Sequence, residues 1–175
     1  MKTLNIKFLA LTLFVLVTGV KSYAQISKAE IIATGLTCSM CSNAINKQLK
    51  SMTEVDSIST DLNTNTFTVY FKENTLLQPK VLKTAVEKAG FFVGSMVLTM
   101  KLDTQKIENN TTFKIEDGSF IFIEPNNQIS DKETQYKVLD KGFVTQKEYK
   151  KLAKSYSKHP SYATENENDY HLKAI

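Results

Sequence analysis

Cys38 and Cys41 are the residues of this chain whose types and spacing most directly indicate chemistry, and the chain has no other cysteine. Their C-x-x-C spacing serves metal binding and thiol–disulfide exchange, and thiolate is the reactive form in both. The pair falls where a short strand ends, at Gly35, and an amphipathic helix begins. The positive end of the helix dipole and its free backbone N–H groups favour thiolate at both positions. We therefore expect the function of the chain to depend on these two sulfurs.

A structural disulfide between the same two cysteines is the plain alternative. It would close a very short loop, for which the chain-entropy model gives about 2 kcal/mol of stabilisation. A fold that needs a cross-link would place it across a longer loop. Metal or redox chemistry is therefore the favoured interpretation of the pair.

The hydrophobic pattern of the first hundred residues predicts four strands and two helices that position the cysteines. The expected elements are strands 28–35, 55–62, 66–71 and 92–100, and helices 41–50 and 79–89. The expected apolar stripes are Ala44, Ile45, Leu49 and Met52 in the first helix and Val81, Leu82, Ala85, Val86 and Ala89 in the second. Pro79 suits the first turn of the second helix, and Gly90 suits its C-terminal cap. The order of elements is β-α-β-β-α-β, the split βαβ arrangement.

The pattern changes after residue 101 and predicts a second, smaller and mostly β unit. Thr145 and Glu148 have the spacing of a capping box, which marks the start of a helix. The other expected elements are a hairpin that turns at 116–118, a strand at 136–139, a polar loop over 157–168 and a last strand over 170–174. This order fits an open barrel of the OB type.

These elements divide the chain into a targeting segment, 1–24, a first domain, 28–100, and a C-terminal unit of unknown role, 101–175. A unit of roughly 70 residues can bury a core of its own, if a marginal one. We therefore expect the first domain to fold without the second. The alternative is that its last strand continues through Leu102 and the two units share one core.

The N-terminal segment has the anatomy of a secretory signal peptide. Lys2 and Lys7 precede an apolar run over 8–20, and Ser22 and Ala24 place small residues before a cut ahead of Gln25. The apolar run is shorter than the roughly 20 residues that span a bilayer. We therefore expect an exported protein whose mature form is soluble and, most simply, periplasmic.

Removal of the signal peptide lowers the formal net charge from +4 to +1, because the segment carries three lysines and no acidic residue. The sequence has no basic stripe with interleaved aromatic residues. Nucleic acid is therefore not expected as a partner.

The run from Gly35 to Cys41, Gly-Leu-Thr-Cys-Ser-Met-Cys, resembles the heavy-metal-associated domain, whose signature is Gly-Met-Thr-Cys-x-x-Cys. The resemblance extends over 28–100 and includes the order of elements and the Gly-Phe pair before the last strand. Leu36 departs from the usual methionine, which is a packing residue of similar volume. The resemblance implies an α+β fold, a ferredoxin-like βαββαβ sandwich, followed here by the small mostly-β unit.

The resemblance also implies that Cys38 and Cys41 are the metal ligands. Soft thiolates select Cu(I), Hg(II) or another thiophilic ion, and a two-ligand site stays open to an incoming third thiolate. The family includes copper chaperones, modules of copper-transporting P-type ATPases and the periplasmic mercury-binding protein. We therefore expect an exported copper or mercury chaperone or scavenger, with a membrane metal transporter or another metal-binding protein as its partner.

Three further residues could bind metal, but the sequence favours plainer roles for them. Met40 is a candidate third soft ligand, although we favour an apolar contact at a docking surface. His159 and His171 lie far from the cysteines in sequence, and a closed zinc site would need four ligands. We expect both histidines to be ordinary surface or strand residues.

A thiol–disulfide oxidoreductase that uses the same cysteines is the alternative function. Ser39 and Met40 stand where thioredoxin-like sites have Gly-Pro, and Ser42 stands where a c-type haem site needs histidine. The C-terminal unit shows no sequence pattern of a Ser-His-Asp set or a phosphate-binding loop. We expect a protein that is not an enzyme.

Overall fold

The computed structural model describes residues 24–36, 39–73, 75–102, 107–115, 117–125, 133–164 and 166–175. The predicted signal peptide, apart from Ala24, lies outside these residues, as do Thr37 and Cys38. The strands are β1 (Ala24–Thr34), β2 (Val55–Asp61), β3 (Thr66–Phe71), β4 (Phe92–Leu102), β5 (Thr111–Ile115), β6 (Gly118–Glu124), β7 (Thr134–Val138) and β8 (Asp169–Ala174). The helices are α2 (Ser39–Lys50), α3 (Pro79–Lys88), α4 (Gln146–Ser155) and the 3₁₀ turn η1 (Tyr162–Thr164).

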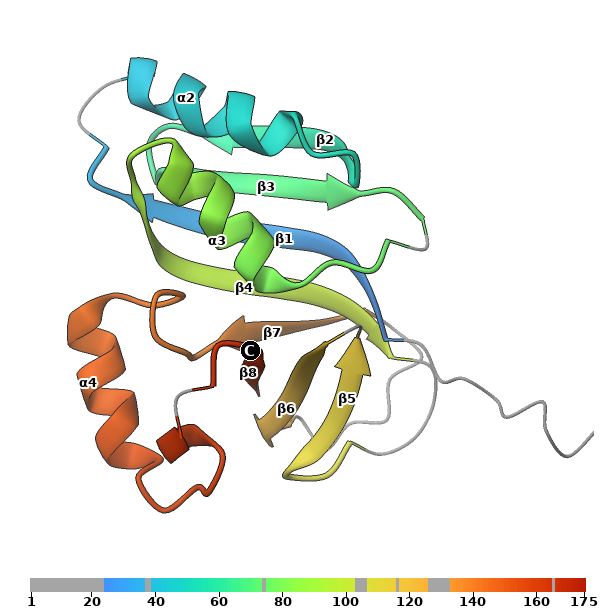
Figure 1. Ribbon diagram of the computed structural model, residues 1–175. Helices are drawn as coiled ribbons and strands as arrows, with labels where there is room; N and C mark the ends of the chain where they lie inside the picture. Colours follow the sequence, from blue (N-terminus) through green and yellow to red (C-terminus); the bar gives the residue numbers. More distant parts are fainter. Residues whose placement is uncertain are drawn as a thin grey trace, which may run out of the picture.

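The first half of the chain, 24–102, has the predicted β-α-β-β-α-β order and confirms the ferredoxin-like arrangement. Its strands lie in the order β2-β3-β1-β4, all antiparallel, and α2 and α3 cover one face (Figure 1). Ile31 of β1 lies between Phe67 of β3 and Met96 of β4, and all three side chains are fully buried. Alternate residues of these strands therefore face the helices and form the core.

The second half, 107–175, extends this sheet instead of forming a separate barrel. β4 pairs with β7 in antiparallel register, and the described strands form one eight-stranded sheet in the order β2-β3-β1-β4-β7-β8-β6-β5. β6 and β8 form the parallel pair. The predicted OB-type barrel is not confirmed, because sequence order alone could not show that β4 has a free edge for β7.

The largest buried cluster of apolar side chains runs across both halves. It joins Ile31, Phe67 and Leu82 of the first half to Phe122 and Tyr170 of the second. A smaller cluster packs α4 and η1 against the opposite side of β6. Since β4 extends to Leu102, this is the shared-core arrangement that the sequence left as the alternative.

A polar bridge also joins the halves at the start of α3. The side chain of Gln78, 3 % exposed, donates to Asp117 in the β5–β6 turn and accepts a 3.2 Å hydrogen bond from the hydroxyl of Tyr170. Lys80 Nζ adds a 2.8 Å hydrogen bond to Asn168. Buried polar groups that all find partners hold neighbouring elements in a defined arrangement.

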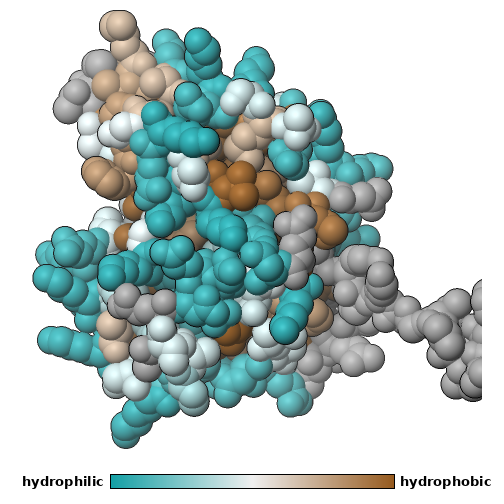
Figure 2. Space-filling model, in the orientation of Figure 1, coloured by the Kyte–Doolittle hydropathy of each residue, from teal (hydrophilic) through white to brown (hydrophobic). Residues whose placement is uncertain are grey.

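Some local predictions were wrong. Ala44 and Val81, expected in the apolar stripes, are exposed, whereas Ile45 and Leu82 are buried. In the view of Figure 2, which has the orientation of Figure 1, hydrophilic residues cover most of the surface and the strongest hydrophobic colour lies near its middle. The expected polar loop over 157–168 contains η1, whose Tyr162 is 5 % exposed.

The helix boundaries follow the predicted capping residues. Pro79 is the first residue of α3, and the left-handed Gly90, with φ +89°, follows its C-terminal cap. The side chain of Thr145 accepts a 3.2 Å hydrogen bond from the backbone N–H of Glu148 at the start of α4. Among the helices that the structure describes, none is both long and apolar enough to cross a membrane.

Candidate metal site

The candidate site begins where β1 gives way to α2. Gly35 has φ +89°, a conformation that favours glycine, and it turns the chain out of the strand. Cys41 lies in the first turn of α2 and is half-buried. The next residue, Ser42, is 4 % exposed. The helix therefore holds the Cys41 side chain at the boundary between core and surface.

The charge of α2 favours a thiolate at its beginning. The first turn of a helix has backbone N–H groups without intrahelical partners, and the macrodipole makes this end positive. The first turn of α2 carries no acidic residue, and Lys47 and Lys50 lie in its last turn. An anionic sulfur at Cys41 therefore meets no neighbouring carboxylate within its own turn of helix.

Two apolar side chains pack next to the start of the loop between β1 and α2. Leu36 and Phe91 are partly buried and pack against the main core. The Phe91 ring lies 3.8 Å from the position that a Cβ atom on Gly35 would occupy. At the same end of the sheet, the Thr34 hydroxyl donates a 3.3 Å hydrogen bond to the carbonyl of Phe92. Phe91 thus lies against the loop, as the predicted fold requires.

Two large apolar side chains are exposed near this end of the fold. Met40, at 79 % exposure, precedes Cys41 at the start of α2, and Phe92, at 66 %, begins β4. Met40 is therefore exposed, as an apolar contact at a docking surface requires. Flexible, polarizable methionine side chains are common at surfaces that contact more than one partner.

Cys38 lies outside the described residues. The joint binding of one ion by both cysteines stays a prediction from the sequence. Within the described ranges, no group of three or more His, Cys, Asp or Glu side chains is arranged to hold a metal ion.

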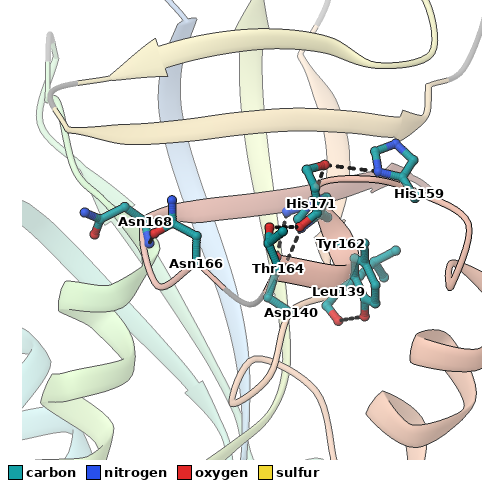
Figure 3. A network of polar contacts seen from close by, with 9 residues as sticks. Leu139, Asp140, His159, Tyr162, Thr164, Asn166, Asn168 and His171 are labelled. Atoms are coloured by element: carbon teal, nitrogen blue, oxygen red, sulfur yellow. Dashed lines mark hydrogen bonds and ion pairs between the residues drawn. The ribbon is translucent and has the colours of Figure 1, made fainter.

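The structure brings the two histidines together, which the sequence analysis did not predict. Their rings are 5.8 Å apart between centroids and nearly perpendicular (Figure 3). His171 of β8 is 2 % exposed, and its Nδ1 lies 2.6 Å from the carboxylate of Asp140. His171 is a strand residue, as expected, but it lies at the centre of a buried polar network that the sequence did not predict.

The hydroxyl of Ser161 lies between the two rings. Its Oγ is 2.9 Å from Nε2 of His171 and 3.0 Å from Nδ1 of His159. Asp140, His171 and Ser161 thus follow one another in the hydrogen-bond order of a serine-hydrolase triad. Asp140 and His171 border a cavity of about 730 Å³ beside α3, but Ser161 is not among its lining residues. A substrate in that cavity would therefore not meet the hydroxyl, and the arrangement does not support a nucleophilic serine.

Burial has opposite consequences for an acid and a base in this network. It raises the pKa of the Asp140 carboxyl, because the charged form loses water, although contacts with His171 oppose the shift. It lowers the pKa of His159, and the nearby charge of His171 adds to that effect. Both changes favour the neutral form of the side chain.

The sequence carried little signal for this network. Asp140, His159, Ser161 and His171 come from two separate loops and one strand, β8. In β8 the structure buries His171 on one face of the sheet and its neighbours Tyr170 and Leu172 on the other, so both faces of the strand are covered. The partners of His171 depend on how the chain between α4 and β8 folds back.

Comparisons with known proteins concern the first half of the chain. The model of the heavy-metal-associated domain matches residues 30–92, just over a third of the chain. Among similar solved structures, the yeast copper transporter domain Ccc2a is 29 % identical over 37 % of this chain and 88 % of its own, with a TM-score of 0.34. A copper-binding domain from HMA7, a P-type ATPase, is 33 % identical over 38 % of this chain and 88 % of its own, with a TM-score of 0.34.

A third structure is the water-soluble region of the P-type ATPase CopA from Bacillus subtilis, 26 % identical over 42 % of this chain and 47 % of its own, with a TM-score of 0.35. No curated protein matches the chain. The family match coincides with the observed β-α-β-β-α-β unit and includes the loop between β1 and α2. Residues 30–92 of this chain therefore form a heavy-metal-associated domain.

Proposed function

We propose that this chain is an exported copper-binding protein that holds one Cu(I) ion between the thiolates of Cys38 and Cys41. The observation that carries the proposal is the position of Cys41, half-buried in the first turn of α2 within the segment that matches the family. The solved structures described above include copper-binding domains, which supports copper as the ion. Mercury is the second candidate, because Hg(II) is also thiophilic.

Two thiolates suit an ion that has to be passed on. A site with only two protein ligands leaves room for a third thiolate from a partner, which binds before one of the first two leaves. The exposed Met40 and Phe92 provide apolar contacts for such a partner at the same end of the fold. We propose a membrane metal transporter or another metal-binding protein in this role, and no catalytic activity.

The proposed location is the periplasm, after cleavage ahead of Gln25. β1 pairs with β4 from Ala24 onward, with Gln25 opposite Lys101 and Ile26 opposite Met100. Cleavage at this point would therefore leave the pairing from Gln25 onward intact. Mass spectrometry of the protein secreted from an expressing cell tests the site of cleavage directly.

Competition for Cu(I) against a chromogenic chelator, with the protein kept reduced, tests the metal site. We expect one ion per chain. We expect Cys38→Ser and Cys41→Ser each to remove tight binding, because a single thiolate ligand binds the ion weakly. Met40→Leu is the matched control, since it keeps the loop and its apolar character. Undiminished affinity in the doubly substituted protein would overturn the proposal.

Refolding of a scrambled disulfide substrate tests the oxidoreductase alternative. A metal carrier should be a poor catalyst of this reaction even when fully reduced. Strong turnover that depends on both Cys38 and Cys41 would favour the oxidoreductase.

A further inference from the structure

The strongest unexplained feature outside the thiol loop is the pair of imidazoles that face one hydroxyl. Nδ1 of His159 and Nε2 of His171 both lie within about 3 Å of Ser161 Oγ, at 3.0 and 2.9 Å. The two residues come from different segments, the turn after α4 and strand β8. Their inward nitrogens therefore converge on one point.

The outward nitrogen of each ring is held by its own partner. Nδ1 of His171 lies 2.6 Å from Asp140 Oδ1, and Asp140 Oδ2 accepts a 2.6 Å hydrogen bond from the His171 backbone N–H. Nε2 of His159 lies 2.5 Å from Asn110 Oδ1. A carboxylate or amide oxygen behind each ring is the arrangement that orients histidines which bind metal.

With these outer partners, the centre of the network has fewer hydrogen-bond donors than acceptors. With Oδ1 of Asn110 and the Asp140 carboxylate facing the rings, each outward nitrogen donates the ring proton and each inward nitrogen presents a lone pair. The hydroxyl of Ser161 has one proton and cannot donate to both nitrogens. Ser161 can therefore donate to only one of the two nitrogens at a time, whereas a cation would bind both lone pairs.

We infer that His159 and His171 form a second metal site, in which Nδ1 of His159 and Nε2 of His171 bind one borderline divalent ion. Imidazole suits Cu(II) and Zn(II), and the Irving–Williams order makes Cu(II) the tighter of the two. Water would complete the coordination. The inference does not depend on the proposed function of the cysteines, because the two sites share no ligand.

The site has to contract slightly to bind an ion. Metal–imidazole bonds are about 2.0–2.1 Å long, so an ion at the hydroxyl position needs each nitrogen to approach by roughly 1 Å. The Ser161 side chain has to rotate away, because its Oγ occupies that position. His159 can move, because it lies in the partly exposed turn that follows α4. His171 is fixed by its contact with Asp140, so His159 makes the larger movement.

The test uses the full chain carrying Cys38→Ser and Cys41→Ser, because the thiols would bind or reduce Cu(II). Titration with Cu(II), followed by calorimetry and pulsed EPR, should show one ion per chain coordinated by two imidazoles. His159→Gln in the same background should lower the affinity at least about tenfold and reduce the imidazole count to one. Lys158→Gln, next to His159, is the matched control and should change neither value.

An imidazole count of one or zero in the parent protein, or the same affinity in His159→Gln, would overturn the inference. A failure here is distinguishable from failure of the thiol site, since Cu(I) binding is measured with intact cysteines. Circular dichroism of each variant shows that the fold is retained.

Asn110 tests the positioning of His159 separately. Its φ of +69° is tolerated by glycine, so Asn110→Gly removes the amide without straining the turn. We expect a loss of affinity of about tenfold, with two imidazoles still counted at saturating Cu(II). An unchanged affinity would remove Asn110 from the site and contradict the orientation that the inference requires.

Discussion

The two halves of the molecule assemble their chemical groups in different ways. In the first half, Cys38 and Cys41 lie on one loop between β1 and α2, so the sequence shows them directly. In the second half, Asp140, His159 and His171 come together only when β8 inserts between β7 and β6. A site built on one loop can be found as a motif, whereas a site built across strands needs the fold.

Each half nevertheless contributes side chains and a paired strand to a core that spans both. The main buried cluster draws on both, and β4 pairs with β1 on one side and with β7 on the other. The two halves can therefore be separated by their chemical groups but not by their hydrophobic core.

The largest expected effect comes from removing one buried ring in either half. Phe67 and Phe122 are both fully buried, and Phe122 makes an edge-to-face contact with Tyr136 at 4.9 Å. We expect Phe67→Ala and Phe122→Ala each to lower the free energy of unfolding by about 3–5 kcal/mol. Urea unfolding followed by circular dichroism measures both.

The number of unfolding transitions distinguishes a shared core from two independently folding halves. If the core is shared, both variants should lower the midpoint of one common transition. Two separate transitions, each moved by one variant only, would show that the halves fold independently. Phe92→Ala is the control, because that ring is 66 % exposed and should cost less than 0.5 kcal/mol.

A smaller effect is expected at the start of α4, the helix of the second half. Thr145→Ala removes the side-chain oxygen that accepts from the Glu148 backbone N–H, and we expect a loss of about 1 kcal/mol. Thr145→Ser keeps the oxygen and should restore most of that stability. Equal losses in both variants, measured by urea unfolding, would mean that the cap contributes nothing.

The hydrogen bond between the halves should contribute a similar or smaller amount. Tyr170→Phe leaves the ring in the core but removes the hydroxyl that donates to Gln78, at a cost of about 0.5–1.5 kcal/mol. Tyr70→Phe, at a 43 % exposed position, is the control and should be neutral. A Tyr170→Phe protein as stable as the parent would show that the polar bridge does not stabilise the fold.

The smallest effect concerns two aspartates, one in each half, with opposite pKa shifts. The Asn63 backbone N–H and the Thr64 hydroxyl lower the pKa of the exposed Asp61, each at 2.9 Å. Burial raises the pKa of Asp140. Carboxyl carbon NMR across a pH titration should therefore find Asp61 below and Asp140 above 3.8.

The two shifts have opposite consequences for stability. The contribution of Asp61 is present above its unfolded pKa and is lost as pH falls through its lower folded pKa. The contribution of Asp140 is present below its unfolded pKa and is lost as pH rises through its higher folded pKa. A pKa of Asp140 below 3.8 in the folded protein would contradict the raised pKa that its burial predicts.

Sequence reasoning reached most of the elements but not their assembly. Pro79, Gly90 and Thr145 act at helix ends through local geometry, and their predictions are confirmed. Ala44 was misplaced because an alanine carries little information about which side of a helix it faces. The insertion of β8 between β6 and β7 depends on contacts between distant residues, and no local pattern encodes it.

The pairing of β4 with β7 has a consequence for how copies of the chain can meet. A four-stranded unit would leave β4, with its buried Leu98 and Met100, as an open edge able to hydrogen-bond to another molecule. Here the outermost described strands are β2 and β5, which are seven and five residues long. Asp56 and Lys114 lie exposed on them. Short, charged outer strands disfavour strand-by-strand growth into aggregates, so this chain should tolerate high local concentration in a crowded compartment.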